Sequence, residues 1–377
     1  MSLGSASGAK VTGREQPYEA SADSGWGMLT TLRGAARFLD ERIGLSWIGL
    51  ALSLTVLAVA SVVLFHILQD IDRDDVLDAI EAVPYRNIGL AGLFVAAGYF
   101  TLTFYDLFAL RTIGRSDVSY KVAALAGFTS YSVGHNIGAS MFTAGAVRYR
   151  IYSAYGLDAI DVAKICFLAG LTFWLGNATM LGLGILCVPD AASAIDQLPP
   201  NVNRALAALV LIVLAGYIAW VWRRPRSIGR SQWRVTLPSG PSTLLQIGIG
   251  MVDLSCCALA MYMLVPTEPN IGFVTVSVIF VSATLLGFAS HAPGGLGVFD
   301  AAMLVALWQF DKEDLLAGLL LFRLLYYIVP FALTLAILGT REAWINLVGA
   351  RVPRPCVASP LQRGDKPEVV GNKTEAR

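Results

Sequence analysis

The sequence predicts an all-α, polytopic integral membrane protein with about eight transmembrane helices and additional glycine-broken or re-entrant segments. Of the 377 residues, 55% are hydrophobic and only 15% are charged. Ordinary globular domains carry roughly 25% charged residues, so charge is depleted here. The apolar residues gather in continuous runs of spanning length. A transmembrane β-barrel would instead show alternating segments of about ten residues.

The runs of spanning length are separated by short charged loops. They cover residues 46–68, 88–110, 165–187, 205–222, 244–265, 272–290 and 315–338. Two further apolar stretches, 122–147 and 292–309, are interrupted by glycine and polar residues. The run at 46–68 is too long for the core of a cleavable signal peptide, so we expect a retained helix.

The flanks divide the chain into three parts. We expect residues 1–45 to form a cytoplasmic tail, in which 28–42 form either a short interfacial helix or a solvated helix that caps its neighbours. Residues 46–340 form the membrane domain. Residues 341–377 are rich in proline and charge and have no apolar period, which indicates a disordered cytoplasmic tail. Residues 71–83 suggest a second helix lying at a membrane surface.

The orientation follows from the loop charges, because Lys and Arg gather on the cytoplasmic side. Basic loops expected inside contain Arg111, Arg115, Lys121, Arg148, Arg150, Lys164, Arg223, Arg224, Arg226, Arg230 and Arg234. Acidic loops expected outside contain Asp70 to Glu81, Asp190, Asp196, Glu268 and Asp311 to Asp314. The pattern is consistent if 122–147 dips in and returns on one side, while 272–290 and 292–309 each cross. Both termini are then cytoplasmic. An arrangement in which the second broken segment enters only half of the membrane is the alternative.

Four charges lie inside the apolar runs: Asp106, Asp253, Asp300 and Arg323. Charges at membrane depth are costly by a few kcal/mol, so each is a candidate functional residue. The alternative is that they form structural ion pairs or lie near the headgroups. Asp106 is about 7 Å of helix from Arg111, which leaves the second alternative open.

The two breaks carry more information than any single charge. Residues 134–138 include His135 and Asn136, and residues 293–297 include Gly294 and Gly295 and follow His291. Proline and closely spaced glycines disrupt a helix, and irregular backbone at membrane depth requires surrounding protein or a water-filled cavity. We therefore expect the breaks to line an internal cavity. In each half a helical aspartate precedes a histidine-containing break, which suggests an internal repeat.

Arg148 closes the first broken stretch. Helix ends at such breaks attract anions, and an arginine can bind phosphate with two hydrogen bonds. Arg148 and Arg150 could equally be cytoplasmic anchors of the positive-inside type. The two interpretations are compatible.

Enzyme signatures are lacking in the sequence. Its three histidines and five cysteines have no metal-ligand spacing, and neither a phosphate-binding loop nor a dinucleotide fingerprint occurs. We therefore expect neither catalytic residues nor a metal or cofactor. The formal net charge of +1 gives no reason to expect nucleic acid.

Four motifs together resemble a known family. They are residues 134–152 (GHNIGASMFTAGAVRYRIY), 173–176 (FWLG), 290–300 (SHAPGGLGVFD) and 322–330 (FRLLYYIVP). In this order they are similar to the lysylphosphatidylglycerol-synthase transmembrane family, which includes the flippase half of multiple-peptide-resistance factors and YbhN-type inner-membrane proteins. The resemblance covers residues 42–340. It implies movement of an anionic or aminoacylated phospholipid between leaflets, and it matches Asp106, Arg148, Asp253 and Asp300 to family positions.

Family members that are synthases also carry a soluble aminoacyl-transferase domain. Fewer than forty residues follow Thr340, too few for such a domain, so lipid aminoacylation by this chain is not expected.

The leading hypothesis is therefore a phospholipid translocase, multi-pass in a bacterial cytoplasmic membrane. The expected substrate-binding residues are Asp106, His135, Asn136, Arg148, Asp253, His291, Gly294, Gly295, Asp300 and Arg323. The alternatives are an accessory protein that presents lipid to a separate synthase or envelope enzyme, and a membrane-embedded enzyme. Besides phospholipid, the partner could be such a synthase or a second copy of the chain.

Overall fold

The computed structural model describes residues 73–137, 140–223, 226–229 and 234–349, together with Val62 and Phe65. The predicted tail 1–45 and the helix at 46–68, apart from Val62 and Phe65, lie outside these residues, as does the predicted tail 341–377 beyond Gly349. Residues 341–349 are helical, which corrects the start of that tail. The described part is helical except for one short antiparallel pair, β1 (Ser227–Ile228) and β2 (Val235–Thr236).

Five helices in the described part are long and apolar enough to cross a membrane. Four are continuous: α4 (Tyr85–Thr112), α7 (Ala159–Cys187), α9 (Pro200–Arg223) and α10 (Gly240–Leu264). The fifth is built from α13 (Lys312–Arg323), a π-helical turn η3 (Leu324–Ile328) and α14 (Val329–Gly349). All five coincide with predicted runs. Local signals mark some ends: the Asp158 carboxylate accepts a hydrogen bond from the Asp161 N–H at 2.7 Å and caps α7.

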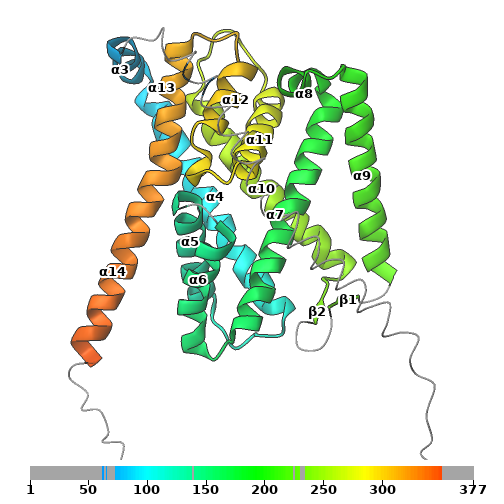
Figure 1. The fold of residues 1–377 in the computed structure, drawn as a ribbon, viewed down its shortest axis with the longest axis vertical. Coiled ribbons are helices and arrows are strands. Elements are labelled where there is room, and N and C mark those ends of the chain that lie inside the picture. Colours follow the sequence, from blue (N-terminus) through cyan, green and yellow to red (C-terminus); the bar gives the residue numbers. More distant parts are fainter. Residues whose placement is uncertain are drawn as a thin grey trace, which may run out of the picture.

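The first broken stretch forms a helical hairpin. Its arms are α5 (Tyr120–Ile137) and α6 (Ser140–Tyr152), which pack against each other in the lower half of the molecule (Figure 1). With 13 residues, α6 rises only about 20 Å, less than the roughly 30 Å of a hydrocarbon core. The stretch therefore returns to the end from which it started, as expected. A short 3₁₀ turn η1 (Ser153–Tyr155) follows it.

The second broken stretch, 292–309, forms a hairpin at the opposite end together with the apolar run 272–290 before it. Its arms are α11 (Phe273–Ala289) and α12 (Val298–Ala306), joined by the 3₁₀ turn η2 (Pro293–Gly295) in the upper half of the molecule. We expected two separate crossings here. The structure instead has arms of 17 and 9 residues, rising about 25 and 14 Å. Neither arm reaches across in the view of Figure 1, so the chain returns to the end at which α11 begins.

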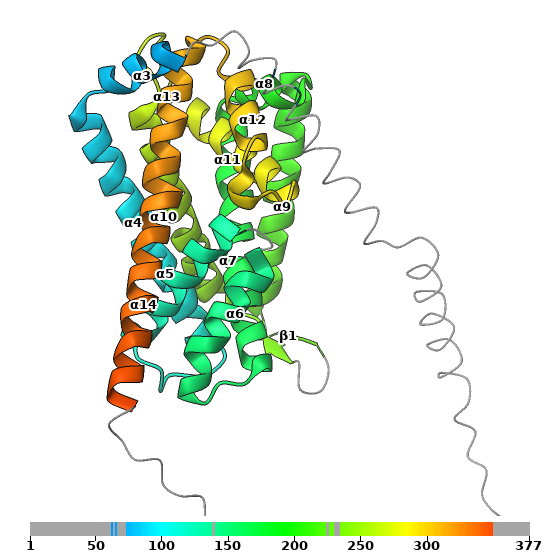
Figure 2. The same ribbon diagram turned by 60° about the vertical axis from the view of Figure 1, so that its left-hand side comes forward.

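The two halves of the chain run in opposite senses. The helix α4 descends, a hairpin enters from the lower end and α7 ascends; α10 ascends, a hairpin enters from the upper end and α13–α14 descends (Figures 1 and 2). Helices α4 and α10 pack along each other, and α5 contacts η2 where the two hairpins meet. This is the order of an inverted-topology repeat, as in many secondary transporters.

The loop charges follow this arrangement. The acidic elements α3 (Arg73–Ala82), α8 (Pro189–Asp196) and the start of α13 lie together at the upper end. The connections α4–α5 and α6–α7 and the β1–β2 pair lie together at the lower end, which carries Arg111, Lys121 and Lys164. The predicted separation of acidic and basic loops is thus consistent with the fold, and which end faces the cytoplasm stays a prediction.

Close packing and apolar surface fall on different helices. Helices α7 and α10 approach through Gly176 and Gly250, where a Cβ on Gly176 would lie 2.8 Å from the backbone of Gly250. The outer helix α9 instead exposes Ile212 and Val213 to 67% and 64%, which suits contact with lipid chains.

Candidate functional site

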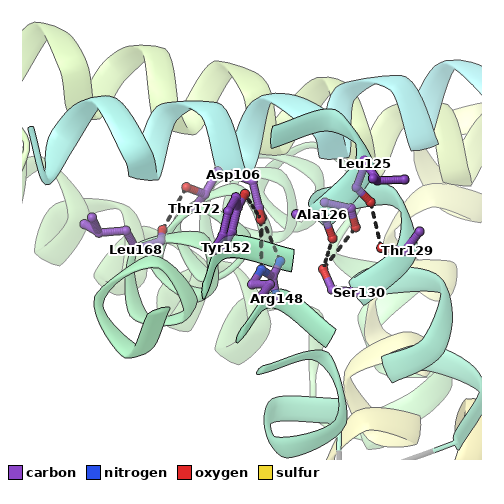
Figure 3. A network of polar contacts seen from close by, with 10 residues as sticks. Asp106, Leu125, Ala126, Thr129, Ser130, Arg148, Tyr152, Leu168 and Thr172 are labelled. Carbon is purple, nitrogen blue, oxygen red and sulfur yellow. Dashed lines mark hydrogen bonds and ion pairs between the residues drawn. The ribbon is translucent and has the colours of Figure 1, made fainter. Parts of the chain in front are cut away.

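A buried ion pair joins α4 to the first hairpin. The Arg148 guanidinium donates from Nε to both carboxylate oxygens of Asp106, at 3.1 and 3.0 Å, and from Nη2 to Oδ1 at 2.8 Å (Figure 3). Asp106 is fully buried and Arg148 is 3% exposed. The pair is therefore enclosed by protein, and the depth of Asp106 in the membrane stays a prediction.

Two tyrosines complete this first pair. Tyr152, one turn after Arg148 on α6, donates its hydroxyl to Asp106 Oδ2 at 2.8 Å. Tyr131 on α5 places its ring under the Arg148 guanidinium, with Cζ 4.9 Å from the ring centroid. The carboxylate is thus held by an arginine and a phenol, and the arginine by a carboxylate and an aromatic face.

Other polar side chains around this pair are satisfied within their own helices. Figure 3 shows Thr129 and Ser130 of α5 donating to the carbonyls of Leu125 and Ala126, at 2.7 and 2.5 Å. Such bonds to the preceding turn remove the cost of a buried hydroxyl without a partner helix. These hydroxyls therefore do not compete for the charged pair.

A second ion pair lies in the opposite half. Arg323 on α13 donates from Nε to Asp300 Oδ1 at 2.9 Å and from Nη2 to Oδ2 at 2.6 Å. The same carboxylate accepts the Gly297 N–H at 3.1 Å, at the start of α12. Arg323 also donates from Nη1 to the carbonyl of Gly294 at 3.3 Å. The second pair thus ties the spanning helix to the glycine break itself.

The tips of the two hairpins meet. Gly294 adopts φ +59°, and a Cβ there would lie 3.5 Å from the carbonyl oxygen of His135. Asn136 donates from Nδ2 to the carbonyl of Tyr327, in the π-helical turn, at 3.2 Å. π-Helical turns of this kind occur frequently at functional sites. The breaks at 134–138 and 293–297 are therefore in contact, as expected for two segments facing one interior.

The histidines of the two breaks differ. His135 is surrounded by the rings of Tyr131, Tyr326 and Tyr327, with centroid distances of 5.9–6.3 Å. Its Nδ1 is buried and has no hydrogen-bond partner among the described residues. His291 is exposed, adopts φ 55°, and its Nδ1 bonds only the nearby carbonyl of Ala289. Its contacts do not join it to either ion pair.

Asp253 stands apart from both pairs. It lies on α10, is 4% exposed and contacts hydroxyls of α4: Tyr105 Oη donates to Oδ2 at 3.0 Å, and Thr101 Oγ1 lies 3.3 Å from Oδ1. It makes no ion pair with any described residue. The ion pairs that the sequence left open as an alternative are thus observed for Asp106 and Asp300, and Asp253 has none among the described residues.

Sequence reasoning missed the aromatic partners of these charges. Tyr105, Tyr131 and Tyr152 were not singled out, because tyrosine is common in membrane helices and carries no charge. The available signal was spacing, and only for Tyr152, which follows Arg148 by one turn on the same face of α6.

The cavity expected between the two breaks does not coincide with either of two pockets in the described part. One of about 400 Å³ lies on the outer face of α9 beside Trp222, and one of about 190 Å³ lies between α7 and α11. Neither is lined by the ion pairs. The described residues also contain no group of three or more His, Cys, Asp or Glu side chains that could hold a metal ion.

Known proteins resemble this chain over most of its membrane part. A Synechocystis protein, slr0712, is 26% identical over 269 residues, which cover 71% of this chain and 83% of that protein. Inner membrane protein YbhN of Escherichia coli is 29% identical over 276 residues, covering 70% and 83%. No family model matches the chain.

Phosphatidylglycerol lysyltransferases are also similar, but over a smaller share of their length. The Staphylococcus haemolyticus protein is 27% identical over 290 residues, which cover 74% of this chain and 32% of the lysyltransferase. The chain thus spans about a third of these relatives. Together with the apolar helices, these similarities identify the chain as a multi-pass inner-membrane protein, homologous to YbhN and to the membrane part of the phosphatidylglycerol lysyltransferases.

Proposed function

We propose that the protein moves an anionic phospholipid between the two leaflets of the inner membrane. The observation that carries the proposal is the pair of arginines, the buried Arg148 and the partly buried Arg323, each held by one aspartate beside one of two opposed hairpins. Charges at this depth are costly, and in membrane proteins they commonly mark substrate pathways. A lipid headgroup is a substrate that must pass this depth.

Arginine suits the phosphate of such a headgroup. Its planar guanidinium binds carboxylate and phosphate with the same fork of donors. In both pairs the aspartate occupies this fork through two nitrogens, Nε and Nη2. A lipid phosphate would bind by replacing the carboxylate, with similar geometry and the same sign of charge.

The opposed hairpins offer a route for alternating access. Arg148 belongs to the hairpin that enters from the lower end, and Arg323 contacts the break of the hairpin that enters from the upper end. Contacts between the tips close the interior in this conformation. Movement of one hairpin would open its arginine to one leaflet while the other hairpin stays closed, which is the logic of inverted repeats.

The similarity to phosphatidylglycerol lysyltransferases supports a lipid substrate. Those relatives are named for acting on phosphatidylglycerol, an anionic phospholipid. We propose that this chain shares their handling of the lipid within the membrane and not the lysyl transfer. Substrates of the translocase would then be phosphatidylglycerol or an aminoacylated derivative of it.

The test is lipid transfer by purified protein in liposomes. Fluorescent phosphatidylglycerol is placed in one leaflet, and its accessibility to an added membrane-impermeant quencher is followed in time. Wild type should transfer the lipid, whereas Arg148→Ala and Asp300→Asn should not. Arg150→Gln is the matched control, because Arg150 is exposed on the same helix as Arg148.

Two results would refute the proposal. The first is unchanged transfer by Arg148→Ala and Asp300→Asn. The second is the lack of transfer of any headgroup by folded wild type. If that protein nevertheless binds fluorescent phosphatidylglycerol, the accessory function, in which lipid is presented to another enzyme, replaces translocation.

A further inference from the structure

Asp253 carries chemistry that the two ion pairs do not explain. Its carboxyl is buried between α10 and α4. In the described part it forms hydrogen bonds only with two hydroxyl groups, those of Tyr105 and Thr101. The side chains of Asp106 and Asp300 are also shielded from solvent, and each forms an ion pair with an arginine. An ionised carboxyl without a counter-ion is the most costly of these arrangements, and binding a proton removes that cost.

The hydroxyl geometry provides a place for that proton. Thr101 Oγ1 lies 2.7 Å from the carbonyl oxygen of Gly98 and 3.3 Å from Asp253 Oδ1. A threonine hydroxyl has one hydrogen, and the shorter contact is the usual bond to the preceding helical turn. When that hydrogen points to Gly98, Thr101 faces Oδ1 with lone pairs. A hydrogen on Oδ1 then completes the contact, with the carboxyl as donor.

The titratable groups around Asp253 are all neutral when protonated. In the described part these neighbours are Tyr99, Tyr105, Tyr131, Tyr326, Cys256 and Cys257. They come from α4, α5, η3 and α10 itself. None is a Lys, Arg or His that could hold the carboxylate charged. A proton is therefore the cation that this site is built to exchange.

The site is connected to the first ion pair through α4. Two adjacent residues of this helix take part in the two sites. Tyr105 donates a hydrogen bond to Asp253, and Asp106 accepts one from Arg148. The Tyr105 ring also packs edge-to-face on Tyr131, at 5.7 Å, and Tyr131 lies under the Arg148 guanidinium. Two aromatic rings in edge-to-face contact thus lie between the Asp253 carboxyl and the Arg148 guanidinium.

We propose that Asp253 is a proton-binding site whose loading and release are coupled to lipid transfer. In each cycle one proton from water on one side binds the carboxylate, and the carboxyl releases it to water on the other side, which regenerates the carboxylate. This inference rests on the proposed function, because it supplies that function's energy source. An anionic lipid moving together with one proton would carry no net charge.

The first test measures the final distribution of lipid between leaflets rather than its rate. Proteoliposomes with fluorescent phosphatidylglycerol receive a gradient of about one pH unit, with the membrane potential clamped to zero. One proton per lipid would shift the leaflet ratio up to about tenfold, because one pH unit is a tenfold ratio of proton activity. Wild type and the surface variant Asp190→Asn should show this enrichment, and Asp253→Asn should give the ratio of protein-free liposomes.

Three outcomes would overturn the inference: a wild-type ratio that ignores the pH gradient, a ratio that follows a sodium gradient instead, or an unchanged ratio in Asp253→Asn.

The second test needs no lipid transfer. Infrared difference spectra of purified protein, titrated with acid, should show the C=O band of a protonated carboxyl that disappears in Asp253→Asn and shifts in Tyr105→Phe. If that band is present while wild type moves no lipid, the translocase proposal fails and the proton site stands; a spectrum without it refutes the proton site.

Discussion

Asp106→Asn should destabilise the protein strongly, because it leaves the Arg148 charge buried without its partner. The two side chains are 0% and 4% exposed and share three N–H···O contacts of 2.8–3.1 Å. Removing one partner of such a pair costs about 3–5 kcal/mol of unfolding free energy. Replacing both with apolar side chains of similar size, Asp106→Leu with Arg148→Met, should cost far less, because no buried charge remains.

The measurement is a double-mutant cycle of Asp106→Leu, Arg148→Met and the double variant, with Asp106→Asn measured beside them, on unfolding of the purified protein in mixed micelles, followed by tryptophan fluorescence. All variants carry Tyr152→Phe, because Tyr152 would otherwise lose its acceptor and add about 1–3 kcal/mol of its own. Asp117→Asn is the matched control, since Asp117 pairs with Arg115 in a loop where its side chain is 60% exposed. The hydrogen bond from Arg115 lowers the pKa of Asp117, but water screens an exposed pair, so its loss should have little effect.

The reasoning is refuted if Asp106→Asn costs less than about 1 kcal/mol, the value typical of an exposed pair. It is also refuted if the effects of the two single substitutions simply add, because a contacting charge pair must show coupling. The apolar double variant separates stability from function. It should fold about as well as the Tyr152→Phe protein and still fail to transfer phosphatidylglycerol.

Three further substitutions test the breaks and the packing. Gly294→Ala should destabilise by about 1 kcal/mol or more in thermal or detergent unfolding, because φ is +59° there, whereas Gly170→Ala, with open space around its Cβ position, should be neutral or slightly stabilising. Arg323→Lys should keep the charge but lose the two-nitrogen grip on Asp300, so lipid transfer should fall severalfold; wild-type transfer would show that charge alone suffices. Gly176→Ala should destabilise by about 1–3 kcal/mol, because its Cβ would lie 2.8 Å from the backbone of α10; an unchanged melting temperature would contradict that close approach.

The spanning helices could be predicted because hydropathy reports directly on them. The runs 88–110 and 165–187 lie within α4 and α7. Helix α4 begins three residues before its run and ends two residues after it, and α7 begins six residues before its run and ends with it. The depth of α11 could not be predicted in this way. Its 17 residues fall at the lower limit for crossing, and hydropathy measures apolar environment, not the height at which a helix stops.

The charged site was predictable in its members and not in its pairing. Asp106 and Arg148 attract notice because each interrupts an apolar stretch or ends one. Their contact joins residues 42 positions apart, and that of Asp300 with Arg323 spans 23 positions. Which acid meets which base depends on how the hairpins fold back, and periodicity carries no information about this. For the same reason, only the structure could show that no arginine of the described part lies beside Asp253.

The placement of the ion pairs is more informative than their strength. A buried pair is often no more stabilising than apolar residues of the same volume, so stability alone does not account for two of them. Both lie where a hairpin contacts a spanning helix, with opposite polarity: the arginine belongs to the hairpin in the first pair and to the spanning helix in the second. A phosphate that displaces Asp106 would therefore stay with the lower hairpin, whereas one that displaces Asp300 would stay with α13 and free the upper hairpin. Because the two exchanges release different elements, we infer that they open the interior at different ends, which is the requirement for moving a headgroup without leaving an open pore.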